Sequence, residues 1–163
     1  MAITYEKIAT TTLGTAASTI TFSSIAATYT DLRLVFTTIS GAASVFVRLN
    51  SDTGNNYSSL YILGSGSAAS SGSYSNNSAI PLADNTSSTA LSFQAADIFS
   101  YAGSTYKTVL SENNNDQNGS GWLERTVSLW RNTAAINTIL ITTLGATTFS
   151  AGSTATLYGI LKA

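Results

Sequence analysis

Three carboxylates, Glu112, Asp116 and Glu124, flank one polar stretch of the sequence and are the residues that could do chemistry together. A pair of carboxyl groups at a fixed separation across a sugar cleft is what glycoside hydrolysis needs. The chain has no histidine and no cysteine, so it lacks the side chain that titrates near neutral pH and a thiolate nucleophile. No histidine can activate the many serine hydroxyls. We therefore expect no catalysis, and a small carbohydrate-active enzyme stays a remote alternative.

Two polar segments could hold a cation, but neither supplies a complete ligand set. The run that begins at Asn114 is similar to a calcium loop, yet Asn replaces its first Asp, and Arg125 stands where the bidentate Glu is required. Asp52, with Asn55 and Asn56, has oxygen ligands for a weakly bound hard cation, although this spacing is first of all tight-turn chemistry. We expect no metal and no cofactor.

One acidic residue and two tryptophans are expected to have structural roles rather than catalytic or binding ones. Asp97 lies between apolar residues, where a carboxylate paired with arginine or with backbone amides is commoner than a catalytic carboxyl with a raised pKa. Trp122 and Trp130 are eight residues apart on one expected strand, so they share a face and are expected to fill the interior. Tyr74 lies in a polar segment and is the better candidate for contact with a partner.

Two segments are expected to be long exposed loops, Ser65–Asn77 and Glu112–Gly121, because they are polar and rich in small residues. Loops of this length in compact domains often carry binding residues, and hydroxyls, amides and aromatic rings suit contact with saccharides. The predicted contact residues are Tyr74, Asn76, Asn77, Asn114, Asp116 and Asn118.

The composition narrows the class of protein. Only 9% of the 163 residues are charged, against about 25% in ordinary soluble domains, and close to a third are Ser or Thr. The net charge of −1 argues against a nucleic-acid partner, since binding phosphates needs clustered Lys and Arg. No apolar run is long enough for a membrane span, and the start lacks a secretory pattern, so no membrane partner is expected. With 44% apolar residues, however, the chain can build a core.

Short alternating runs of apolar and β-branched residues indicate strands along most of the chain. Leu32, Leu34 and Phe36 lie two apart, as one buried face of a strand requires. No longer segment has a helical apolar stripe, and 132–136 is one turn at most. We expect one domain, 1–163, with an all-β fold: an antiparallel two-sheet β-sandwich, jelly-roll-like, of eight to ten strands. The expected strands are 3–12, 18–23, 31–40, 44–50, 57–64, 90–101, 105–111, 122–131, 137–144 and 154–161.

Several segments resemble a family of short virion proteins of tailed phages, particularly aquatic and cyanobacterial ones. The similarity runs through nearly the whole chain and is carried by these segments: Tyr5–Thr10, Phe22–Ile25, Tyr29–Leu34, Asp52–Ser58, Asp97–Tyr101, Leu129–Arg131 with Ala135–Ile136, Phe149–Thr154 and Leu157–Ile160.

The resemblance implies a sandwich or jelly-roll structural protein on the virion surface, with no catalytic residue. We expect a capsid decoration, or cement, protein that binds the outside of the shell and bridges major capsid protein subunits. The alternative is the head of a tail or head fibre that binds a receptor or a host-surface glycan. Low charge suits both functions, because charged side chains normally keep surfaces apart. By the same resemblance, a homo-oligomer is expected, most simply a trimer.

Overall fold

The computed structural model describes residues 5–39, 44–83, 86 and 90–161. Over these residues the backbone forms twelve β-strands and no helix. In chain order the strands are β1 (Tyr5–Thr12), β2 (Thr19–Phe22), β3 (Asp31–Thr38), β4 (Val45–Leu49), β5 (Tyr57–Gly64), β6 (Ala69–Asn77), β7 (Ile80–Ala83), β8 (Ser92–Ile98), β9 (Lys107–Asp116), β10 (Gly121–Trp130), β11 (Ile139–Thr143) and β12 (Thr154–Ile160).

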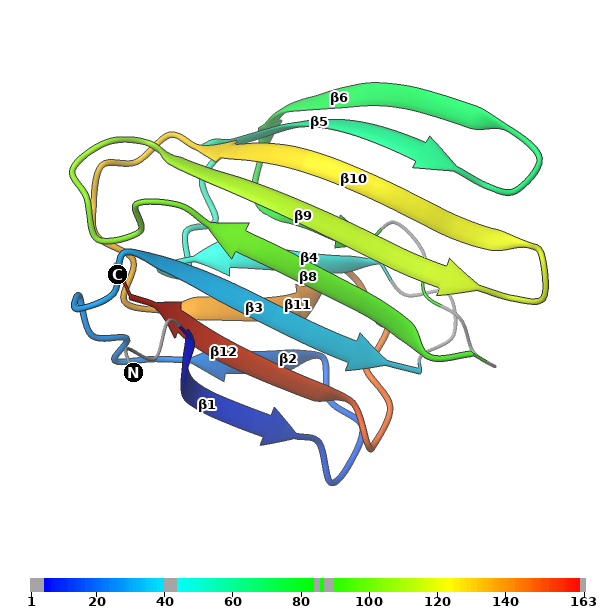
Figure 1. Cartoon of the computed structure of the whole chain (residues 1–163), viewed down its shortest axis with the longest axis horizontal. Helices are drawn as coiled ribbons and strands as arrows, with labels where there is room; N and C mark the ends of the chain where they lie inside the picture. Colours follow the sequence, from blue (N-terminus) through cyan, green and yellow to red (C-terminus); the bar gives the residue numbers. More distant parts are fainter. Residues whose placement is uncertain (1–4, 40–43, 84–85, 87–89, 162–163) are drawn as a thin grey trace.

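The strands form two antiparallel sheets that pack as the two layers of a β-sandwich (Figure 1). The larger sheet has eight strands in the order β1-β12-β3-β8-β9-β10-β5-β6, and the smaller has four in the order β2-β11-β4-β7. Figure 1 shows the larger sheet in front, with β6 at one end and β1 at the other. The predicted all-β, two-sheet antiparallel sandwich is confirmed, and a jelly-roll-like description is consistent with it.

The strand count differs from the prediction of eight to ten, because β6 and β7 were not predicted. β7 is only four residues long and contains Pro81, which the sequence alone presents as a strand breaker. It is tolerated here because β7 is an edge strand, paired with β4 on one side. Residues 3, 4 and 40 of the predicted strands lie outside the described residues.

The prediction that Ser65–Asn77 is an exposed loop is wrong. Most of this segment is β6, which pairs with β5 from Gly64↔Ala69 to Tyr57↔Asn77. Serine and asparagine side chains give no apolar alternation, so the strand has no signal in the hydrophobic pattern. Its backbone groups gain partners from β5, and this pairing fixes its conformation.

The prediction of a long loop over Glu112–Gly121 is also wrong. β9 extends to Asp116 and β10 begins at Gly121, so only four residues form the turn. The turn has two positive φ angles, 59° at Asn118 and 86° at Gly119, which Asn and Gly tolerate best. The polar residues that indicated a loop are therefore strand residues whose side chains alternate between the two faces of the sheet.

The main core lies between the two sheets and is mostly apolar under β3 and β12. Leu32, Leu34 and Phe36 of β3 are fully buried, as their spacing predicted. The ring of Phe36 meets that of Phe149 edge to face, with 4.9 Å between ring centroids. On β10, Trp130 is also fully buried and stacks on Tyr57 at 6.4 Å, so the interior placement predicted for it is confirmed. The same prediction is wrong for Trp122, which is partly exposed because it lies next to the turn at the end of the sheet.

The inner face of β9, β10 and β5 is polar instead. Its buried polar side chains from the second half of β9 and from β10 and β5 are Ser111, Asn113, Asn115, Glu124, Thr126, Ser128 and Ser59. Some of them bond to one another or to a neighbouring strand, whereas Ser111 Oγ and both side-chain polar atoms of Asn115 are buried without a hydrogen bond to any described residue. The hydroxyls of Ser59 and Ser128 are 2.7 Å apart, and Gln94 Nε2 donates to Asn113 Oδ1 at 3.1 Å. These bonds offset part of the cost of burying polar groups.

Candidate functional site

The outer face of the larger sheet has an apolar patch over β9, β10 and β5. The patch consists of Leu60, Ile62, Leu110, Leu123 and Val127, whose exposed fractions run from 37% to 63%. The strand register brings them together, because Val127 lies opposite Leu60 on one side and opposite Leu110 on the other. A group of large apolar side chains on the exposed face of a sheet is a common site of contact with another macromolecule.

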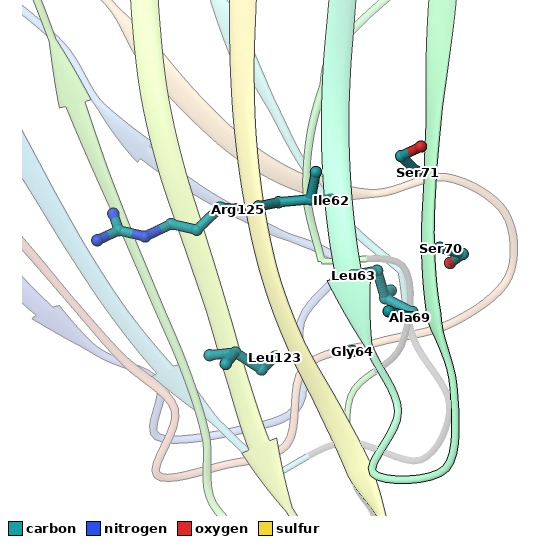
Figure 2. A pocket seen from close by; sticks show the side chains of 8 residues that line it. All are labelled: Ile62, Leu63, Gly64, Ala69, Ser70, Ser71, Leu123 and Arg125. Carbon is teal, nitrogen blue, oxygen red and sulfur yellow. The ribbon is translucent and has the colours of Figure 1, made fainter.

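An open hollow of about 490 Å³ lies at the β5–β6 end of the patch. Figure 2 shows Ile62, Leu123 and the long Arg125 side chain among the residues that line it, with Ser70 and Ser71 on the neighbouring strand. Aliphatic groups from β5 and β10 thus lie beside the serine hydroxyls of β6. Such a surface can bury apolar area while its rim accepts and donates hydrogen bonds.

A network of four charged side chains borders the patch on the β8 side. Arg33 Nη1 lies 2.9 Å from Asp97 Oδ2, and Arg125 Nη1 lies 3.3 Å from Glu112 Oε2. Arg33 Nη2 also approaches Glu112 Oε1 at 4.0 Å, so the two pairs are joined. Of the partners expected for Asp97, arginine is the one found. Two positive and two negative groups leave this border with no net charge.

The three carboxylates that suggested glycoside hydrolysis do not face one cleft. Glu112 is on the outer face of β9, in the charged network, whereas Glu124 is buried on the inner face of β10. The sheet backbone therefore lies between them. Asp116 is at the end of β9, where its Oδ1 accepts a hydrogen bond from the Gly119 amide at 3.0 Å and closes the turn. This arrangement does not form the acid and base pair that the sequence left open.

The predicted contact residues fall into two separate groups. Tyr74, Asn76 and Asn77 are on β6, where the Tyr74 ring stacks on Tyr61 with centroids 5.4 Å apart. Asn76 Oδ1 accepts a hydrogen bond from Arg131 Nη2 at 2.8 Å.

The second group, Asn114, Asp116 and Asn118, is at the β9–β10 tip, with Asn118 in the turn itself. Asn114 and Asp116 line a second open hollow there together with Trp122. The prediction that these six residues contact a partner stays a prediction.

The Asp52 segment is a turn, as its sequence indicated. Asp52 Oδ1 accepts a hydrogen bond from the Gly54 amide at 2.8 Å, and Oδ2 accepts from Asn56 Nδ2 at 2.9 Å and Trp130 Nε1 at 2.8 Å. Burial acts to raise the pKa of Asp52, but the hydrogen bonds from Trp130, Asn56 and Gly54 outweigh it and hold the pKa below its ordinary value. Nearby, burial raises the pKa of Tyr57 to about 12.

Among the described residues, no group of three or more His, Cys, Asp or Glu is placed to hold a metal ion. The same residues include no helix that is long and apolar enough to cross a membrane.

Sequence reasoning missed the apolar patch, although a signal for it was present. Strand β5 has large apolar residues at both odd and even positions. Tyr61 and Leu63 are on one face of the sheet, and Leu60 and Ile62 are on the other. A strand with one buried face shows alternation of apolar and polar residues, so apolar residues on both faces indicate that both faces meet other groups.

Comparison with known proteins identifies no family for the chain. No protein-family model matches it, and no curated protein matches it. The solved structures that a structural search finds include two lectins, both with low scores. A peanut lectin with a nine-residue peptide has a TM-score of 0.40 and 11% identity, over 98% of this chain and 92% of that one. A basic winged bean lectin with Tn-antigen has a TM-score of 0.22 and 8% identity, over 90% and 82%. These values carry no argument about function.

Proposed function

We propose that this protein is a non-catalytic structural protein of the tailed-phage virion surface, a decoration protein that docks on the major capsid protein. The observation that carries the proposal is the apolar patch on the outer face of the larger sheet. Its side chains gain from the removal of water, and each square ångström of apolar surface that docking buries contributes about 25 cal/mol before the costs of association.

Two other features support docking on a protein surface. The charged network beside the patch has balanced charges held in fixed ion pairs, so it can approach a partner without a large electrostatic penalty. The chain as a whole has only fifteen charged side chains, seven basic and eight acidic, which keeps repulsion low against a dense shell.

Co-sedimentation with phage heads that lack the protein tests this proposal. The double variant Leu60→Ser with Leu123→Ser should fold normally but bind the heads at least about tenfold more weakly, because two central anchors are lost. The matched control is Leu91→Ser with Leu144→Ser, which changes two exposed leucines outside the patch, 59% and 45% exposed. Equal binding by the two double variants would contradict the assignment of the patch.

Densitometry of intact virions then separates the two virion functions. A decoration protein should be present in a fixed ratio to the major capsid protein, whereas a fibre protein is expected in only tens of copies. If virions contain none of the protein, both virion functions are wrong.

One observation favours a second candidate, a fibre head that binds a host-surface glycan. The hollow at the β9–β10 tip is lined by Trp122 and Asn115, an indole and an amide that lie opposite each other in the register and so share one face of the sheet. Aromatic faces and planar polar groups are a suitable pair for a sugar ring. Glycan-array binding by the protein that disappears in Trp122→Ala and survives in Leu60→Ser with Val127→Ser would favour this function over docking.

A further inference from the structure

The four edges of the two sheets are not equally protected against pairing with another strand. An open edge exposes unpaired backbone N–H and C=O groups, and proteins usually blunt such edges with charges, proline, bulges or short strands. On three of the four edges the strand has protective side chains, is short or is interrupted by a bulge away from its end, whereas on β6 the feature is an irregularity near one end. β1 has Glu6 and Lys7 and a bulge between Lys7 and Ala9. β2 and β7 are four residues long, and β7 includes Pro81.

β6 has none of these protective side chains. It is nine residues long, without a charged residue or a proline. It pairs with β5 on one side and with no described strand on the other, so it forms an end of the larger sheet (Figure 1). From Ala69 to Tyr74 its register with β5 is regular, one residue opposite one, and the irregularity falls only near Asn77. A regular, uncharged edge of this length is suited to strand addition.

The inner face of β6 is held in position by an aromatic pair. Tyr61 stacks on Tyr74, and its ring lies so close over Gly72 that an added Cβ would come within 2.6 Å of the hydroxyl oxygen. Glycine at this position therefore lets the tyrosine cover the strand. This packing keeps the edge extended before any partner arrives, which lowers the ordering cost of pairing.

We propose that the exposed edge of β6 pairs antiparallel with β6 of a second copy of this chain. Two identical strands without charge do not repel each other, and antiparallel pairing of a strand with itself closes around a two-fold axis. The two eight-stranded sheets would then continue into one another. Ser71 and Ser73, which lie opposite Ile62 and Leu60 in the register, would stand between the two apolar patches and join them into one wider surface. The pairing is independent of what that surface docks on.

Light scattering of the purified protein tests the pairing. The wild-type protein should have the mass of two chains, and the variant Ser71→Lys with Ser73→Lys should have the mass of one. Lysines facing their own copies across the axis should raise the dimer dissociation constant by about tenfold or more. The control, Thr10→Lys with Thr12→Lys, adds the same charge to exposed positions on β1 and should remain a dimer. A wild-type monomer at all concentrations, or a trimer, would overturn the proposal.

Two further measurements locate the contact even if the lysine variant folds poorly. Because the chain has no cysteine, the Ser71→Cys variant, the Ser73→Cys variant and an equal mixture of the two, which covers pairing of Ser71 with Ser73, can form only intermolecular disulfides. At least one should give a covalent dimer on mild oxidation, since opposed residues of paired strands bring Cβ atoms close enough; Thr10→Cys should not. Amide hydrogen exchange over β6 should slow with rising protein concentration and stay unchanged over β1. A dimer without this protection of β6 would place the contact elsewhere and refute the inference.

Discussion

The two halves of the larger sheet have opposite polarity. In β3, the inner residues Leu32, Leu34 and Phe36 are apolar, and outer positions include Arg33 and Thr37. The half formed by β9, β10 and β5 reverses this order, with buried hydroxyls, amides and a carboxylate inside and the apolar patch outside. The first half is stabilised by its own core.

The half formed by β9, β10 and β5 is organised differently. Hydrogen bonds such as the one between Ser59 and Ser128 link its inner strands, while the side chains of its outer apolar patch stay between 37% and 63% exposed. A surface of this kind is stabilised only when something covers it. The difference between the halves therefore separates residues that determine folding from residues that are available for association. Three substitutions test this division, in order of decreasing expected effect.

The largest effect is expected for Phe36→Ala in the apolar half. Phe36 is fully buried against Phe149, so removal of its ring leaves a cavity and should lower the free energy of unfolding by about 3–5 kcal/mol. Urea unfolding followed by circular dichroism measures this loss. The control is Val35→Ala on the same strand, whose partly exposed side chain is on the outer face and should cost far less. Equal losses of unfolding free energy in the two variants would show that the inner face of β3 does not stabilise the fold more than its outer face does.

An intermediate effect is expected for Asp52→Ala, at the turn that joins the smaller sheet to β5. The variant leaves Trp130 Nε1, Asn56 and the Gly54 amide without their acceptor, which should cost about 1–3 kcal/mol at neutral pH.

The pH dependence of the same variant gives a second test. The pKa of Asp52 is lower in the folded state than in the unfolded state. Its contribution to the free energy of unfolding is therefore fully present above the unfolded-state pKa, and it is lost as the pH falls through the folded-state pKa. Wild type and variant should therefore converge in stability between about pH 4 and the acid limit of folding. A constant difference at all pH values would show that the carboxylate charge is not what stabilises the turn.

The smallest effect is expected in the polar interior, from the hydroxyl pair Ser59 and Ser128. Each single change to Ala should cost about 1 kcal/mol, because the remaining buried hydroxyl loses its partner at 2.7 Å. The double variant should cost no more than one single variant, since no hydroxyl of the pair is then left unpaired. Chemical unfolding of the four proteins gives the coupling energy. Strictly additive losses would mean that the two hydroxyls do not stabilise this half through each other.

The sequence alone determined much of the fold. Alternation such as Leu32, Leu34 and Phe36 indicated one buried face for each strand, and the lack of helical periodicity left a sandwich as the simplest solution. The turn at Asp52 and the ion pair of Asp97 were also predictable, because they depend on local spacing or on one residue's need for a partner.

Only the tertiary structure decided the site. The serine strand β6 has no apolar pattern, since its conformation comes from backbone pairing with β5, and backbone groups are the same in every sequence. The patch depends on register. Leu60 and Val127 are far apart in the chain and adjacent in the sheet because β10 pairs with β5 at one particular offset. A shift of one residue would turn each of these side chains to the opposite face, so the outer surface exists only once the strands have paired.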